Sequence, residues 1–160
     1  MMEQVVSFAE KGGKVFGVCN GFQILCEAGL LPGVLLQNEH QKFVCKNVFL
    51  KSESRQNLIG KHVGEKPLKI PVAHGEGRYY ADAAALKRVN ENKQVIFRYC
   101  DEQGEIHINS NPNGALNNIA GICNEGRNVF GMMPHPERAC SEALNNTDGR
   151  AILQALCYSN

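Results

Sequence analysis

The first candidate for chemistry is a cysteine between two glycines, in the run Gly17-Val18-Cys19-Asn20-Gly21. A strand is predicted before it and a helix after it, an arrangement typical of α/β enzymes that carry a nucleophile at a sharp turn, here with sulfur in place of oxygen. The flanking glycines leave room for a strained backbone and for close packing. The N-terminal N–H groups of the following helix would favour a thiolate and lower the pKa of Cys19. A buried core cysteine in a glycine-rich loop is the alternative that this run alone leaves open.

A base for this thiol is predicted near the other end of the chain, where His135-Pro136-Glu137 follows an apolar run. A thiol nucleophile needs a base, and the base needs a partner that orients it. Prolines on both sides fix the backbone of His135, and Glu137 can accept a hydrogen bond from one ring nitrogen. We therefore predict a catalytic triad of Cys19, His135 and Glu137. No sequence neighbours indicate a site at three other histidines, His40, His62 and His107.

The elements that must position these residues alternate between strands and helices, as in an α/β domain with a mostly parallel sheet. The end of an amphipathic helix is predicted over residues 2–10, a strand over 14–18 and a helix over 22–28. Later patterns predict strands around 43–45, 48–50, 68–70, 94–100 and 106–108, a helix over 81–89, a hairpin of 119–123 with 128–133, and a last helix from Thr147 to about Tyr158.

Composition excludes several classes of protein. The 160 residues, 43% hydrophobic and 21% charged, are typical of one globular domain. A net charge of +1 without long runs of one sign argues against nucleic acid as a ligand. No apolar stretch approaches the roughly 20 residues that cross a bilayer, so we expect a cytoplasmic protein with no membrane partner. The seven cysteines include no C-x-x-C pair, so we expect mostly free thiols and no metal site.

Two motifs together resemble the class I, triad-type glutamine amidotransferases: GVCNGFQ at residues 17–23 and HPE at residues 135–137. Four segments resemble, within that family, the glutaminase subunits of phosphoribosylformylglycinamidine synthase, which serve de novo purine biosynthesis. They are PVAHGEGRY at 71–79, NPNG at 111–114, NIAGICNE at 118–125 and MMPHPER at 132–138. The resemblance extends from about residue 2 to residue 158.

The resemblance implies an activity and its partners. Cys19 would attack the side-chain amide of L-glutamine, His135 would take the thiol proton and pass it to departing ammonia, and Glu137 would orient His135. The thioester would be hydrolysed to glutamate. Ammonia would move through a protected passage to a synthetase subunit that converts formylglycinamide ribonucleotide to formylglycinamidine ribonucleotide. ATP and magnesium are expected on that synthetase partner and no cofactor on this chain, which lacks a phosphate-loop motif. A small accessory subunit is a further expected partner.

Four more positions receive roles through the resemblance. Gln23 lies one helical turn after Cys19 and would help bind substrate, with a solvated helix residue as the alternative. His74 and Gly75 match a segment that lines the glutamine pocket, with a simple turn as the alternative. Asn20, directly after the nucleophile, would supply one donor of the oxyanion hole.

The implied fold is a three-layer, flavodoxin-like α/β domain with a mainly parallel central sheet, small antiparallel additions from residues 94–133, and Cys19 at the carboxyl edge of a strand. Members of the family carry a further N-terminal segment with a central strand and a glycine-rich loop that holds the other oxyanion donor. We therefore expect residues 1–160 to form a single glutaminase domain that is incomplete at its N-terminus, and its catalysis alone to be impaired. A catalytically incompetent fragment or docking subunit, and a cysteine hydrolase of the same fold with another substrate, remain alternatives.

Overall fold

The structure is a computed structural model that describes residues 1–158 of the chain. The α-helices of the described residues are α1 (Met2–Glu10), α2 (Asn20–Glu27), α3 (Leu58–His62), α4 (Ala83–Glu91) and α5 (Arg150–Tyr158). Its strands are β1 (Val15–Val18), β2 (Val34–Leu36), β3 (Val44–Ser52), β4 (Leu68–His74), β5 (Arg78–Tyr80), β6 (Val95–Cys100), β7 (Ile119–Cys123) and β8 (Val129–Met132).

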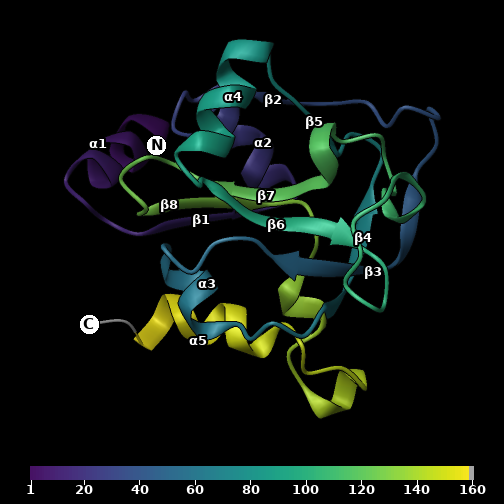
Figure 1. Cartoon of the computed structure of the whole chain (residues 1–160). Helices are drawn as coiled ribbons and strands as arrows, with labels where there is room; N and C mark the ends of the chain where they lie inside the picture. Colours follow the sequence, from purple (N-terminus) through teal and green to yellow (C-terminus); the bar gives the residue numbers. More distant parts are fainter. Residues whose placement is uncertain (159–160) are drawn as a thin grey trace.

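The elements form three layers around a six-stranded sheet in the order β1-β8-β7-β6-β3-β4. Figure 1 shows α2 and α4 above this sheet and α3 and α5 below it. Strands β2 and β5 pair with each other in a separate antiparallel ribbon. The α/β fold predicted from the sequence is confirmed, and so are the helices near residues 2–10, 22–28 and 81–89.

The expected direction of the strands is wrong, because the sheet is mixed rather than mainly parallel. Among the described strands, β1 and β8 are parallel neighbours. The other four pairings in this sheet, β8 with β7, β7 with β6, β6 with β3 and β3 with β4, are antiparallel. A short turn at residues 124–127 joins β7 to β8, and such a turn can connect only antiparallel strands. Residues 94–133 therefore supply the middle of the sheet rather than small additions to it.

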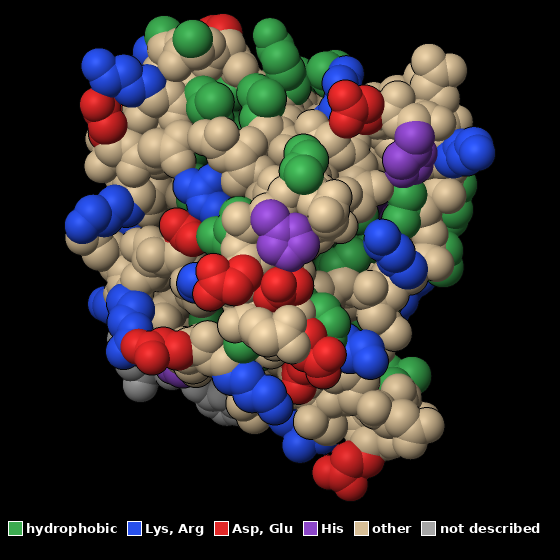
Figure 2. Space-filling model, turned by 45° about the vertical axis from the view of Figure 1, so that its right-hand side comes forward, with side chains coloured by type: hydrophobic (Ala, Val, Ile, Leu, Met, Phe, Trp, Pro, Cys, Tyr) green, Lys and Arg blue, Asp and Glu red, His purple; other side chains and the backbone are tan. Residues whose placement is uncertain are grey.

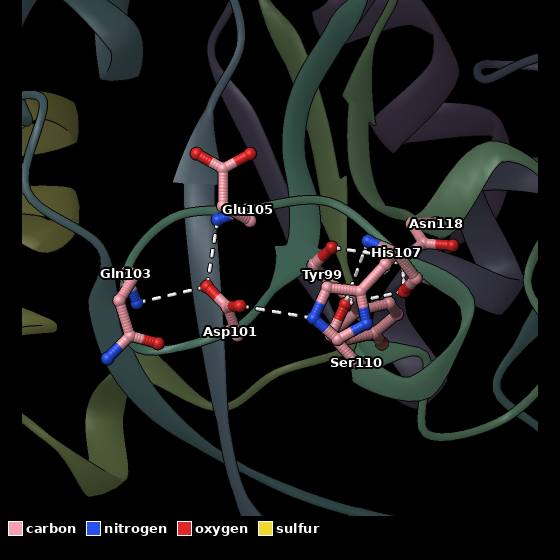
Figure 3. Close-up of polar contacts among 7 residues, drawn as sticks. All are labelled: Tyr99, Asp101, Gln103, Glu105, His107, Ser110 and Asn118. Atoms are coloured by element: carbon pink, nitrogen blue, oxygen red, sulfur yellow. Dashed lines mark hydrogen bonds and ion pairs between the residues drawn. The ribbon is translucent and has the colours of Figure 1, made fainter.

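The prediction of a strand around residues 106–108 is also wrong. This segment is part of a loop that Asp101 organises, since its carboxylate accepts the backbone N–H groups of Gln103 at 3.0 Å and Glu105 at 2.8 Å. Figure 3 shows the same carboxylate beside the ring of His107, which it meets at 3.1 Å. The chain then enters a 3₁₀ turn at Ile108–Ser110. Local side-chain bonds to the backbone therefore override the alternating apolar pattern here.

Helix α2, which begins directly after Cys19, packs closely on β8. The ring of Phe22 is fully buried and stacks on Tyr79 with centroids 6.1 Å apart. A side chain on Gly131 of β8 would collide with Phe22 and with Leu31. Glycine is thus required at residue 131 so that the helix can approach the sheet.

Charged side chains of both signs are interspersed on the face drawn in Figure 2, where several acidic side chains gather beside a histidine. Mixed charge of this kind produces no strong field of one sign over that face. Within residues 1–158, each helix is too short or too polar to span a bilayer.

Candidate active site

The parallel pair β1 and β8 brings the two ends of the predicted triad to one edge of the sheet. The strands are in register, with Val18 opposite Met132. The N–H of Cys19 continues the ladder by donating to the carbonyl of Met132 at 2.9 Å. Because parallel strands end at the same edge, the segments that follow them, with Cys19 on one and His135 on the other, lie next to each other.

Cys19 has a strained backbone at the turn into α2. Its φ of 53° and ψ of −109° lie outside the regions that a residue with a side chain normally adopts. A side chain at Gly17 would collide with the backbone of Gly21 and with Leu25, so a glycine is needed there. At Gly21 an added Cβ would meet nothing within 4 Å. The expected collision of a side chain is therefore found at Gly17 and is absent at Gly21 among the described residues.

His135 is held firmly and leaves one ring nitrogen available. Its N–H donates to the carbonyl of Pro71 in β4 at 2.8 Å, and its Nδ1 lies 2.6 Å from Oε1 of Glu137. The residue is 8% exposed, and its Nε2 is buried with no hydrogen-bond partner among the described residues. A carboxylate on Nδ1 favours the tautomer in which Nε2 is a free acceptor. His135 is thus able to take a proton at Nε2.

One cavity of about 620 Å³ gathers most of the residues singled out in the sequence: Cys19, Asn20, Gln23, His74, Gly75 and His135. Its volume is in the range that suits a small-molecule substrate. Glu137 does not line this cavity and lies behind His135, with its side chain 50% exposed. Its place agrees with a role that acts through the ring of His135.

The electrostatics of Cys19 differ from the expectation. Partial burial raises the pKa of the Cys19 thiol, the backbone N–H of Asn20 and the charge of Arg138 lower it, and Glu137 raises it. The start of α2 thus lowers this pKa as expected, through the N–H of Asn20, but burial has the larger effect and the net pKa is raised. The sulfur is therefore a thiol at neutral pH and needs a base before it can attack.

Gln23 and Asn20 both reach the cavity, but their contacts differ. The Gln23 amide donates to Glu27 at 3.0 Å, one further turn along α2. The Cys19 Sγ lies 3.8 Å from Oδ1 of Asn20 and 3.9 Å from the carbonyl of Ala73. Gln23 would have to exchange Glu27 for a substrate in order to bind one.

Two residues at this site were missed in the sequence. Asn38 and Asn113 are each 1% exposed and lie on either side of the buried ring of His74. Asn113 belongs to the Asn-Pro-Asn-Gly run, which the sequence indicates as a turn and as part of the family resemblance without giving Asn113 a role, and Asn38 lies in a loop after β2. Only the folded chain brings the two asparagines together.

Two further histidines, His40 and His62, bind backbone carbonyl groups outside the cavity. His40 meets the carbonyl of Pro112 at 3.1 Å, and His62 meets the carbonyl of Leu58 at 3.0 Å within its own helix. Across the part of the chain that the structure describes, no three His, Cys, Asp or Glu side chains are grouped so as to hold a metal ion.

Comparison with known proteins identifies the family. A model of the CobB/CobQ-like glutamine amidotransferase domain matches residues 1–154. The chain belongs to this family of glutamine amidotransferase domains. The resemblance predicted from the motifs around Cys19 and His135 is therefore confirmed.

Individual relatives show which glutamine amidotransferases this chain is similar to. The phosphoribosylformylglycinamidine synthase subunit PurQ of Gloeobacter violaceus is 52% identical over 162 residues, which covers 99% of this chain and 69% of the relative. PurQ of Pelagibacter ubique is 49% identical over 156 residues and covers 98% of this chain and 69% of the relative. The structure of PurLQS from Thermotoga maritima matches with a TM-score of 0.81 at 39% identity, over 96% of this chain and 65% of that one. The chain thus spans about two thirds of the length of these relatives.

Proposed function

We propose that this domain hydrolyses the side-chain amide of L-glutamine to glutamate and ammonia through a thioester on Cys19. The observation that carries the proposal is the buried, unpartnered Nε2 of His135, a residue that lines the same cavity as Cys19 and whose other ring nitrogen lies 2.6 Å from Glu137. A buried acceptor without a partner costs stability and is rare in folded proteins, so its presence here supports a catalytic role for this nitrogen. The thiol of Cys19 is the proton donor that this cavity offers.

The steps follow from these groups. Nε2 of His135 takes the thiol proton as the sulfur attacks the amide carbon, and the Glu137 carboxylate stabilises the imidazolium that forms. The backbone N–H of Asn20, at the start of α2, would donate to the developing oxyanion. The imidazolium then gives its proton to the leaving nitrogen, so that ammonia departs and the thioester remains. Water, deprotonated by the same nitrogen, hydrolyses the thioester and restores the thiol.

We further propose that the ammonia is used by a synthetase subunit of phosphoribosylformylglycinamidine synthase, which would convert formylglycinamide ribonucleotide to formylglycinamidine ribonucleotide. The names of the relatives support this partner, since both PurQ proteins are subunits of that synthase. ATP and magnesium would be bound by the synthetase, and a small accessory subunit would complete the assembly. The expected place of this chemistry is the cytoplasm, where purine precursors are made.

The test uses a diazo-ketone analogue of glutamine, followed by intact mass measurement and peptide mapping of the whole chain. We expect one adduct on Cys19 that excess glutamine suppresses. Cys19→Ala should abolish the adduct without unfolding the protein. Cys45→Ser is the matched control, because Cys45 is an exposed thiol outside the cavity and its loss should change nothing.

Two results would contradict the proposal in different ways. An adduct on Cys19 that glutamine fails to suppress would favour a cysteine hydrolase with another substrate. No adduct on a chain that is demonstrably folded would favour a domain that only docks on a partner.

A further inference from the structure

The ring of His74 lies in a cage of two asparagine side chains. Its Nδ1 is 3.1 Å from Oδ1 of Asn38, and its Nε2 is 3.4 Å from Nδ2 of Asn113. His74 is 3% exposed, so both ring nitrogens depend on these partners rather than on water. The order of donors and acceptors in the cage therefore determines where the ring carries its proton.

The Asn38 amide has one orientation that satisfies its neighbours. Its Nδ2 donates to the carbonyl of Lys42 at 2.8 Å and to the carbonyl of His74 at 2.9 Å. Its Oδ1 accepts the N–H of Gly77 at 3.1 Å. A flipped amide would set an oxygen against two carbonyls, so the atom that faces Nδ1 of His74 is an acceptor and Nδ1 must be protonated.

The Asn113 amide is fixed in the same way from the other side. Its Oδ1 accepts the N–H of Ala115 at 3.0 Å, and its Nδ2 donates to the carbonyl of Gly77 at 2.7 Å. The atom that faces Nε2 of His74 is therefore a donor, and Nε2 must be unprotonated. The two asparagines together permit one state of the ring, which is neutral with its proton on Nδ1.

The same bonds hold the wall of the cavity. Asn38 binds the carbonyl of His74 through its side chain and the carbonyl of Gly75 through its N–H, at 2.9 Å in each case. Both asparagines bind Gly77, where an added side chain would collide with the His74 ring. Residues 74–76 line the cavity that Cys19 and His135 share. The cage therefore sets the position of the backbone that a bound substrate would meet.

We propose that His74 is a positioning residue of this site: Asn38 and Asn113 hold its ring in the neutral Nδ1–H form, which fixes the 74–77 wall and leaves His135 free to take the proton. This inference rests on the proposed function, because His135 matters as a base only if Cys19 is the nucleophile. A second cation beside His135 would oppose the imidazolium that the reaction forms. The two buried asparagines prevent it.

The surroundings of the ring support the neutral form. Burial is the largest cause that lowers the pKa of His74, to about 4, and the charges of His135 and His40 act in the same direction. Cys19 and Glu76 lie on the same cavity, and Tyr99 lies beside Asn113 with the pKa of its hydroxyl raised by burial. Of these groups, only Cys19 and Glu76 could offer His74 a negative charge, and neither of them forms a hydrogen bond with its ring.

The test is a long-range ¹H–¹⁵N correlation spectrum of the labelled full chain, followed as a function of pH. At neutral pH we expect His74 to show a protonated Nδ1 and an unprotonated Nε2, with a titration midpoint near the pKa of about 4. A protonated Nε2, or a cationic ring at neutral pH, overturns the proposal. The wild-type spectrum decides this point alone, so the result does not depend on whether a variant folds.

Asn113→Asp then tests whether the cage controls the site. The carboxylate replaces a donor with an acceptor at Nε2 and should raise the His74 midpoint by about 1–3 pH units. The rate at which the glutamine analogue labels Cys19, relative to the rate with iodoacetamide, should fall roughly tenfold or more. Gln103→Glu is the matched control, since it makes the same amide-to-acid change on the surface and should alter neither readout. A raised midpoint with an unchanged ratio of rates would reduce His74 to a structural residue.

The two proposals fail separately. If Cys19 is not labelled in a glutamine-suppressed way while His74 shows the expected tautomer, the proposed function is wrong and the cage is structural. If labelling succeeds and His74 carries its proton on Nε2, the function stands and this inference is wrong.

Discussion

Two histidines, His74 on the cavity and His107 in a surface loop, have side-chain partners of different charge. His74 is 3% exposed and lies between two uncharged amides, Asn38 and Asn113. The His107 side chain is 44% exposed and lies 3.1 Å from the carboxylate of Asp101 (Figure 3). The contact of His74 with Asn38 and the contact of His107 with Asp101 are both 3.1 Å long, so distance alone does not separate them.

The difference lies in burial and in the charge of the partner. Amide partners satisfy a neutral ring and give a cation nothing to pair with, and burial then lowers the pKa of His74 to about 4. At the surface loop it is the carboxyl whose pKa is lowered, first by the N–H of Glu105 and then by contacts that include His107. His135 combines features of both, since it is buried but has a carboxylate on one nitrogen and a free acceptor on the other. The carboxylate beside His135 can stabilise a protonated ring, whereas the two amides beside His74 cannot.

The largest expected effect comes from removing the base in the cavity while leaving the loop intact. His135→Asn should slow the glutamine-analogue reaction of Cys19 by about 10²–10⁴-fold, because the thiol, with its pKa raised by burial, loses its proton acceptor. His107→Asn should leave the rate within about twofold. Rates of adduct formation by intact mass measure both. Equal rates for wild type and His135→Asn would remove His135 from the mechanism.

The next effect concerns stability rather than rate. His74→Ala opens a void in a buried polar cluster and should lower the free energy of unfolding by about 2–3 kcal/mol. His107→Ala removes an exposed pair and should cost less than about 1 kcal/mol. Urea unfolding of both variants gives the comparison directly. Similar losses at the two positions would mean that burial does not distinguish these clusters.

The pH dependence of stability should also separate the two clusters. The folded pKa of His74 is about 4, below its ordinary value of 6.5, so the unfolded chain binds more protons between these values. Stability should therefore fall as pH drops from about 6.5 to about 4, on the order of 3 kcal/mol in all, and be fully present above that window. Urea unfolding across this range should show the slope in wild type and in His107→Ala. The slope should be absent in His74→Ala, and its persistence there would assign the effect to another group.

Much of the site could be predicted from the sequence because its signals are local. Cys19 stands between a predicted strand and a predicted helix. His135 and Glu137 are only two residues apart, next to prolines, so a few neighbouring residues are enough to recognise each motif. The membership in the glutamine amidotransferase family confirms the class that these motifs indicated. The contacts of the three side chains in a working enzyme stay a prediction.

The parts that were missed depend on contacts between distant residues. Asn38 and Asn113 act through His74, and nothing within the sequence around either residue indicates a buried amide. The pKa of Cys19 depends on how deeply the fold buries it, which the helix start alone does not reveal. The strand directions likewise depend on which strands are neighbours, a property that alternating apolar runs leave open. Around Ile106 and Ile108 the apolar alternation was real, but the Asp101 carboxylate holds that segment in a loop.

The smallest expected effect is at Asp101 itself. Its pKa is lowered below the ordinary 3.8, so the stabilisation it provides is present above that pH and is lost as the pH falls through the folded value. Asp101→Asn keeps an oxygen for the N–H groups of Gln103 and Glu105 but loses the charge beside His107. We expect the unfolding midpoint to fall by less than about 2 °C at neutral pH.

Two conditions should remove that difference between wild type and Asp101→Asn. At a pH well below 3.8 the wild-type carboxyl is protonated as well, and in about 1 M salt exposed charges are screened within roughly 3 Å. The loss in His74→Ala should persist in the same salt, because a buried cage of neutral groups has no charge to screen. Thermal unfolding of the two variants with and without salt therefore tests whether the surface contact depends on charge and the buried cage does not. If the loss of stability in His74→Ala depended on salt, the ring of His74 would carry charge in the folded wild-type protein, contrary to the proposed neutral state.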